Sequence, residues 1–133
     1  CQARIAAARL ERSIVLTGYR DDLREILSIS AVVLSLSRHP EAFGRTVNEA
    51  LSLGRPVAGY AHGGVGEQLA ELFPAGQVPV GDRQRMAERL ALWHQQPPQM
   101  EAVKAYRLDN MLQGTLQLYE TLAGDWPPCR TGR

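Results

Sequence analysis

The sequence predicts an α/β fold in which helices cover both faces of a parallel sheet. Two observations carry this prediction. Short apolar runs alternate with helical stretches along the chain, and the runs themselves are almost uninterruptedly apolar. Strand–helix alternation indicates a parallel sheet, and a continuous apolar run is typical of a strand that is buried on both faces. We therefore expect a three-layer α/β/α arrangement.

Four apolar runs are the candidate strands. The first is short and β-branched, the second is the longest, and the third begins at a proline, where a missing N–H is tolerated. In chain order the four runs cover residues 14–17, 31–36, 56–60 and 76–80.

Helical stretches lie between and after these runs. Asp21 and Asp22 supply an N-cap and negative first-turn charge for a helix over residues 23–30, and Gly54 is placed as the C-cap glycine of a helix over residues 44–53. Further helices are expected over residues 2–12, from a glycine turn at 63–66 through residue 72, from residue 82 to a break at 95–99, and over 100–122 as one long helix or a helix pair. One domain would cover residues 1–124, followed by an irregular tail over residues 125–133.

Composition limits the classes of function. Hydrophobic residues make up 44% and charged residues 22% of the 133 residues, which is typical of a globular protein. The formal net charge of +1 gives no sign of nucleic-acid binding. The two cysteines, Cys1 and Cys129, lie near opposite ends and predict neither a metal site nor a disulfide framework, which fits the cytoplasm.

Two carboxylates flank a predicted helix start at the edge of the sheet where ligands of parallel sheets bind. Glu41 follows the second apolar run, and Glu49 lies on the next helix. Between them Phe43 and Gly44 open that helix, whose free N–H groups can face an anion. Because a carboxylate accepts two hydrogen bonds from a vicinal diol, the pattern suits two diols joined by phosphate, as in a sugar nucleotide. The alternative is that both acids are solvated side chains.

Three motifs occur in order: the segment from Glu41 to Leu51, then Gly54-Arg55-Pro56-Val57, then Gly63-Gly64-Val65-Gly66-Glu67. Together they resemble the nucleotide-binding half of GT-B glycosyltransferases, in particular the large retaining family 4 type, the glycosyl transferases group 1. Glu41 and Glu49 meet the E-x7-E motif of that family. The resemblance covers about residues 14 to 122 and implies a Rossmann-like fold.

The resemblance implies a role for each motif residue. Glu49 would hold the ribose diol of the nucleotide, and Glu41 would be the catalytic-site acid that contacts hydroxyls of the donor sugar. The backbone amides expected to face the sugar and the diphosphate are those of Phe43, Gly44, Arg45, Thr46 and Val47. The base would lie against the loop around Gly18-Tyr19-Arg20. The donor would be a UDP-, GDP- or ADP-linked sugar, bound as a substrate, with no cofactor and no metal required.

Four residues beside the motif are expected to make secondary contacts: His39, Gly63, Gly64 and Glu67. His39 is either an ordinary loop histidine or an acceptor contact. Glu67 would order the glycine turn by capping, with a ligand contact as the alternative. The side chain of Arg45 either reaches phosphate or faces solvent.

The sequence also departs from the family pattern. It shows neither the acceptor-binding domain nor the opening strand, glycine turn, Arg and Lys that hold the diphosphate. We therefore expect an N-terminally truncated C-terminal half that is inactive alone and self-associates through an exposed sheet edge. The full-length enzyme would transfer sugar with retention to a glycan or lipid-linked acceptor in cell-surface polysaccharide or lipopolysaccharide biosynthesis, at the inner face of the membrane.

Two other functions stay open. One is a non-catalytic Rossmann-like module that binds nucleotide or protein, although no strand is followed by GxGxxG and no GK[ST] occurs. The other is a sugar-nucleotide 2-epimerase of the same GT-B architecture, which would need acids and histidines in a different arrangement.

Overall fold

The computed structural model describes residues 1–124, and its centre is a three-stranded parallel sheet with the strand order β1-β2-β3. The strands are β1 (Val33–Ser35), β2 (Val57–Tyr60) and β3 (Gln77–Val78). Val33 is paired with Val57, and Gly59 with Gln77. The predicted parallel sheet is confirmed for the second, third and fourth apolar runs, although each strand is shorter than its run.

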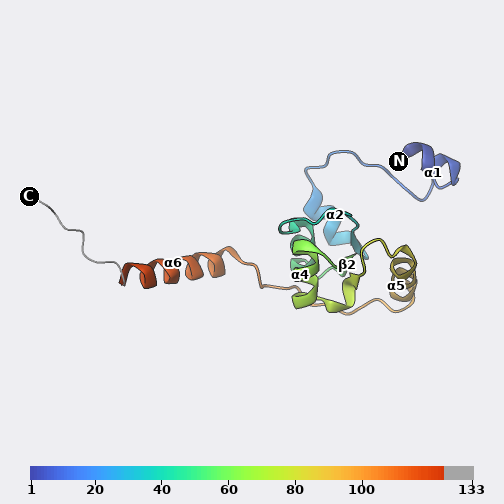
Figure 1. Cartoon of the computed structure of the whole chain (residues 1–133). Helices are drawn as coiled ribbons and strands as arrows, with labels where there is room; N and C mark the ends of the chain where they lie inside the picture. The colour runs from blue at the N-terminus through green and yellow to red at the C-terminus, as the bar shows by residue number, and fades with distance from the viewer. Residues whose placement is uncertain (125–133) are drawn as a thin grey trace, which may run out of the picture.

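The helices alternate with the strands and also extend the chain at both ends (Figure 1). They are α1 (Gln2–Ala7), α2 (Leu23–Ile29), α3 (Arg45–Ser52), α4 (Gly63–Leu72), the 3-10 turn η1 (Pro74–Gly76), α5 (Arg83–Gln95) and α6 (Leu108–Gly124). In Figure 1, α1 and α6 stand away from the body that holds the sheet. Within residues 1–124, no helix combines the length and the apolar character that crossing a membrane requires.

Each face of the sheet has its own buried cluster, which confirms the three layers. On one face α2, α3 and α4 pack against β1 and β2, with Val47, Leu51 and Leu69 almost completely buried. On the other face α5 covers β2 and β3 through Met86 and Trp93. Alternate residues of a strand point to opposite faces, so Val57 joins the first cluster and its neighbour Ala58 the second.

Two glycines set the ends of α3, the helix that carries the second motif acid. Gly44 is the N-cap residue with φ +77°, and Gly54 follows the C-cap residue Leu53 with φ +67°. Both angles lie in the left-handed region that glycine adopts without steric cost. The predicted glycine at the C-terminal end of this helix is confirmed.

The predicted strand over residues 14–17 is wrong. This segment pairs with no strand among residues 1–124, and Val15 is 77% exposed. A β-branched run forms a strand only where a neighbour accepts its hydrogen bonds and a surface covers its side chains. The expectation that residues 31–36 are covered on both faces also fails, because β1 lies at the edge of the sheet and Leu34 is 41% exposed.

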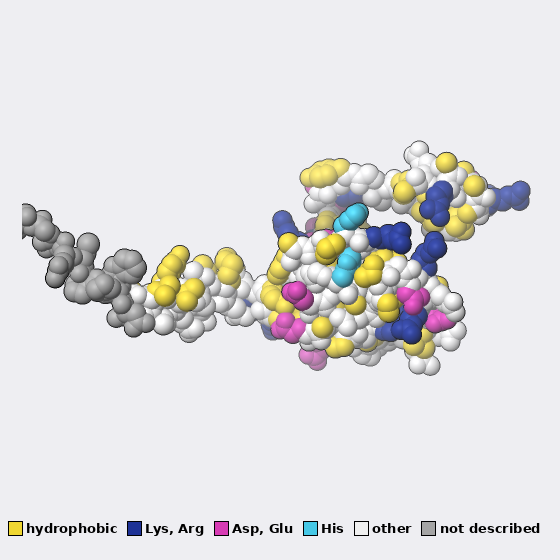
Figure 2. Space-filling view, in the orientation of Figure 1, with side chains coloured by type: hydrophobic (Ala, Val, Ile, Leu, Met, Phe, Trp, Pro, Cys, Tyr) yellow, Lys and Arg dark blue, Asp and Glu magenta, His cyan; other side chains and the backbone are white. Residues whose placement is uncertain are grey.

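The C-terminal helical prediction needs a similar correction, because residues 100–107 are not helical and α6 begins only at Leu108. Met100 and Val103 instead pack against the cluster formed by α2, α3 and α4, and the Val103 N–H donates to the Leu51 carbonyl at 3.0 Å. Along α6 the apolar side chains are mostly exposed, as Figure 2 shows.

Three further boundaries differ from the predictions. The N-terminal helix ends at Ala7 rather than at residue 12, and the glycines at 63–66 form the first turn of α4 itself rather than a turn before it. The last strand covers two residues. The tail predicted over residues 125–133 lies outside the described residues.

Asp82 caps α5, and its removal gives a first prediction. Its carboxylate accepts a hydrogen bond from the Arg85 N–H at 2.9 Å. Asp82→Ala should lower the free energy of unfolding by about 1 kcal/mol, measured by urea denaturation. Asp82→Asn is the matched control, since it keeps the cap acceptor and removes only the exposed ion pair with Arg85. Equal losses in both variants would contradict the capping role.

Candidate functional site

The loop after β1 and the start of α4 after β2 lie against each other at the carboxyl edge of the sheet. The Gly64 N–H donates to the Glu41 carbonyl at 2.8 Å. The His62 Nε2 lies 3.0 Å from the Ser37 carbonyl oxygen. The expectation that the two motifs share this edge is therefore confirmed, and backbone hydrogen bonding joins them directly.

The glycines of this region permit the close approach of two backbones. A Cβ on Gly64 would lie 2.6 Å from the Ala42 carbonyl oxygen, and a Cβ on Gly63 would lie 2.7 Å from that of Glu41. Gly44 is equally restricted, since its Cβ would lie 2.8 Å from the Val65 Cγ2. Gly63 and Gly64, expected as secondary contacts of a ligand, are thus packed against the loop that carries Glu41.

Gln68 on α4 belongs to none of the motifs that predicted the site. It is 2% exposed, and its Nε2 donates to the Phe43 carbonyl. Its Oε1 is buried and has no hydrogen-bond partner within residues 1–124. Because the two residues are 25 positions apart, only the folded chain reveals this contact. His62, which had no predicted role, likewise fixes the loop through Ser37.

The N-terminus of α3 has no capping side chain among residues 1–124. The amides of Arg45 and Thr46 lie in the first turn, where α-helical bonding leaves N–H groups free. The prediction that the Val47 amide faces the sugar and the diphosphate is wrong. Its N–H donates to the Gly44 carbonyl at 3.0 Å and its side chain is 1% exposed, so Val47 belongs to the core.

The two motif acids occupy different surroundings. Glu49 is half-buried and lines a groove of about 470 Å³ between α2 and α3, together with Leu23, Arg24, Leu27, Ser52 and Leu53. Its Oε1 lies 3.7 Å from the Nη2 of Arg45, whose side chain is 86% exposed and therefore faces solvent. Glu41 is exposed, does not line this groove, and makes no side-chain hydrogen bond within residues 1–124.

The Phe43 ring packs against a tyrosine from the C-terminal part of the domain. The rings of Phe43 and Tyr106 meet edge to face, with centroids 5.5 Å apart. The Tyr106 hydroxyl donates to the Glu71 Oε2 at 2.6 Å. This hydrogen bond raises the pKa of Tyr106, and burial and the charges of Glu71 and Glu67 raise it further. Tyr106 therefore stays a hydrogen-bond donor at neutral pH.

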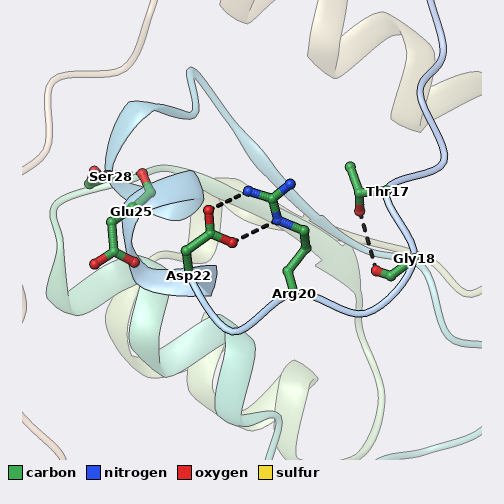
Figure 3. Close-up of polar contacts among 6 residues, drawn as sticks. All are labelled: Thr17, Gly18, Arg20, Asp22, Glu25 and Ser28. Carbon is green, nitrogen blue, oxygen red and sulfur yellow. Dashed lines mark hydrogen bonds and ion pairs between the residues drawn. The ribbon is translucent and has the colours of Figure 1, made fainter.

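The loop expected to contact the base leads directly into α2 (Figure 3). Arg20 Nε donates to the Asp22 Oδ1 at 2.6 Å, and this hydrogen bond lowers the pKa of the Asp22 carboxyl. Asp22 is the predicted N-cap residue of α2, but its side chain makes no capping bond because it is paired with Arg20. Tyr19 is 95% exposed beside it.

The remaining candidates show no ligand-directed geometry. His39 is exposed, and its backbone closes a turn in which the Ser37 hydroxyl donates to the His39 carbonyl at 2.8 Å. Glu67 is exposed, and within residues 1–124 no side chain caps α4, so the predicted capping by Glu67 is wrong. Across residues 1–124, no group of three or more His, Cys, Asp or Glu side chains could hold a metal ion.

Comparison with known proteins agrees with the geometry. The family described as "Glycosyl transferases group 1" matches residues 1–108. A 2-deoxystreptamine N-acetyl-D-glucosaminyltransferase of Streptomyces fradiae is 35% identical over 80 residues, which are 59% of this chain and 19% of that protein. The matched region is thus about a fifth of this relative. With its parallel α/β sheet and its family match over most of its length, the chain belongs to the glycosyl transferases group 1 and carries a GT-B-type domain.

Proposed function

We propose that this chain is the donor-binding part of a retaining glycosyltransferase that uses a nucleoside-diphosphate sugar. The proposal rests on two features of α3, its N-terminus and the position of Glu49. No side chain of the described residues caps its N-terminus, and one helical turn further on Glu49 lines the groove beside α2. One short helix thus offers both an anion site and a diol acceptor.

The nucleoside would occupy the groove between α2 and α3. Glu49 would accept hydrogen bonds from both ribose hydroxyls, and charge-assisted bonds of this kind are strong. Leu23 and Leu27 give the groove an apolar wall on the α2 side. The base would then lie toward the loop at residues 18–20, which continues into α2.

The diphosphate and the donor sugar would lie at the start of α3. The amides of Arg45 and Thr46, with the positive end of the helix dipole, would stabilise the phosphate charge and the leaving diphosphate. Gly44 has no Cβ, which lets Val65 of α4 pack against the backbone at the start of α3. Glu41, exposed at the same edge, would contact hydroxyls of the donor sugar as the catalytic-site acid.

The acceptor would be a glycan or a lipid-linked saccharide in the assembly of cell-surface polysaccharide or lipopolysaccharide. A small aminocyclitol is the second candidate, because the relative's name specifies 2-deoxystreptamine. The same name makes an N-acetylglucosamine nucleotide a donor to include in tests.

Calorimetric titration with UDP, GDP, ADP, their nucleosides and UDP-N-acetylglucosamine tests the proposal. One diphosphate should bind at least about tenfold more tightly than its nucleoside, because charged hydrogen bonds at the helix start add to ribose binding. Absence of binding by every diphosphate, or equal affinities for diphosphate and nucleoside, would overturn it.

A further inference from the structure

The segment over residues 100–107 runs from the core to the loop that opens α3. Its first half is fixed along the C-terminal end of that helix. Met100 and Val103 pack on the core, and the Val103 N–H donates to the Leu51 carbonyl. A Cβ on Gly54 would lie 3.4 Å from the Met100 carbonyl oxygen, so the two backbones are in close contact there. The anchored segment determines where Tyr106 lies.

Tyr106 makes two contacts of different kinds. Its ring meets the Phe43 ring edge to face, and its hydroxyl donates to Glu71 on α4. An edge-to-face aromatic pair is directional, and a hydrogen bond to a carboxylate is stronger than one to a neutral acceptor. These two contacts orient the Tyr106 side chain between Glu71 and the Phe43 ring, although both residues are partly exposed, at 40% and 44%.

Helix α4 fixes the same loop through its backbone. Gly64 donates to the Glu41 carbonyl and Gln68 to the Phe43 carbonyl. Phe43 is thus held at its carbonyl by α4 and at its ring by Tyr106. The next residue is Gly44, whose left-handed conformation directs the first amides of α3.

We propose that Tyr106 is a positioning residue for donor binding, acting through Phe43 to hold the start of α3 in the orientation that receives the diphosphate. That the ligand is a diphosphate rests on the function proposed above. Tyr106 itself would not touch the reacting atoms. Its loss should weaken the recognition of phosphate and leave the recognition of the nucleoside intact.

Two variants separate the contacts of Tyr106. Tyr106→Phe removes the hydrogen bond to Glu71 and keeps the ring, while Tyr106→Ala removes both. Tyr119→Phe and Tyr119→Ala are matched controls, since Tyr119 lies on α6 and is 64% exposed. The first readout is amide hydrogen exchange over residues 41–48. We expect exchange about threefold faster in Tyr106→Phe and about tenfold faster in Tyr106→Ala, with no change in the controls.

The second readout is the affinity for a nucleoside diphosphate and for its nucleoside. Tyr106→Ala should raise the Kd of the diphosphate about fivefold and leave that of the nucleoside within about twofold. Unchanged exchange in both Tyr106 variants, or an equal loss of affinity for both ligands, would overturn the positioning role. If the wild-type chain binds no diphosphate, the proposed function fails, and the exchange rates alone decide whether Tyr106 orders the loop.

Discussion

Gly64→Ala is expected to lower the free energy of unfolding by about 1–3 kcal/mol and to weaken nucleotide binding at the same time. The added Cβ would lie 2.6 Å from the Ala42 carbonyl oxygen and 2.7 Å from the Phe43 Cα. Both are backbone atoms that no side-chain rotation can move. Relief requires α4 and the loop to separate, which stretches the hydrogen bond from Gly64 to the Glu41 carbonyl.

Gly114→Ala is the matched control for that variant. Gly114 lies inside α6, and a Cβ there would meet nothing within 4 Å. It should stabilise α6, because alanine is favoured over glycine inside a helix by about 1 kcal/mol. Urea denaturation of both variants measures the contrast. A Gly64→Ala protein as stable as the wild type would show that the loop and α4 are not closely packed.

Glu49→Gln is expected to have the largest effect on binding, raising the Kd of the nucleoside diphosphate about tenfold to a hundredfold. A neutral amide loses the charge that strengthens bonds to the ribose hydroxyls, and its NH2 group cannot accept one of them. The fold should be unaffected, because Glu49 is only half-buried and its ion pair with Arg45 is a surface pair. Glu101→Gln, at an exposed position, is the control for charge alone.

The sheet and the motif helix could be predicted from the sequence because their signals are local. The apolar runs at 31–36 and 56–60 contain β1 and β2, and Gly44 and Gly54 bound α3 as expected. Residues 14–17 carry the same local signal and form no strand, since a strand also needs a neighbour. The sequence pattern indicates which segments can form a β-strand, and the presence of a neighbouring strand determines whether the strand forms.

The contacts that hold the site could not be predicted because they join distant parts of the chain. The hydrogen bond from Gln68 to Phe43 spans 25 residues, and that from Tyr106 to Glu71 spans 35. The apolar spacing around Met100 and Val103 predicted a helix that residues 100–107 do not form, for a related reason. Docking beside Leu51 holds these residues in a non-helical conformation that also places Tyr106.

The central claim, that Glu49 binds the ribose diol, is tested most directly by a double-mutant cycle with deoxynucleotides. The Kd values of the best-binding diphosphate and of its 2′-deoxy analogue are measured for the wild type and for Glu49→Gln. Loss of the 2′-hydroxyl should cost the wild type about tenfold in affinity. In Glu49→Gln the Kd values of the diphosphate and of its 2′-deoxy analogue should agree within about twofold, because the variant lacks the carboxylate that accepts the hydrogen bond from the 2′-hydroxyl. An equal cost in both proteins would contradict the account.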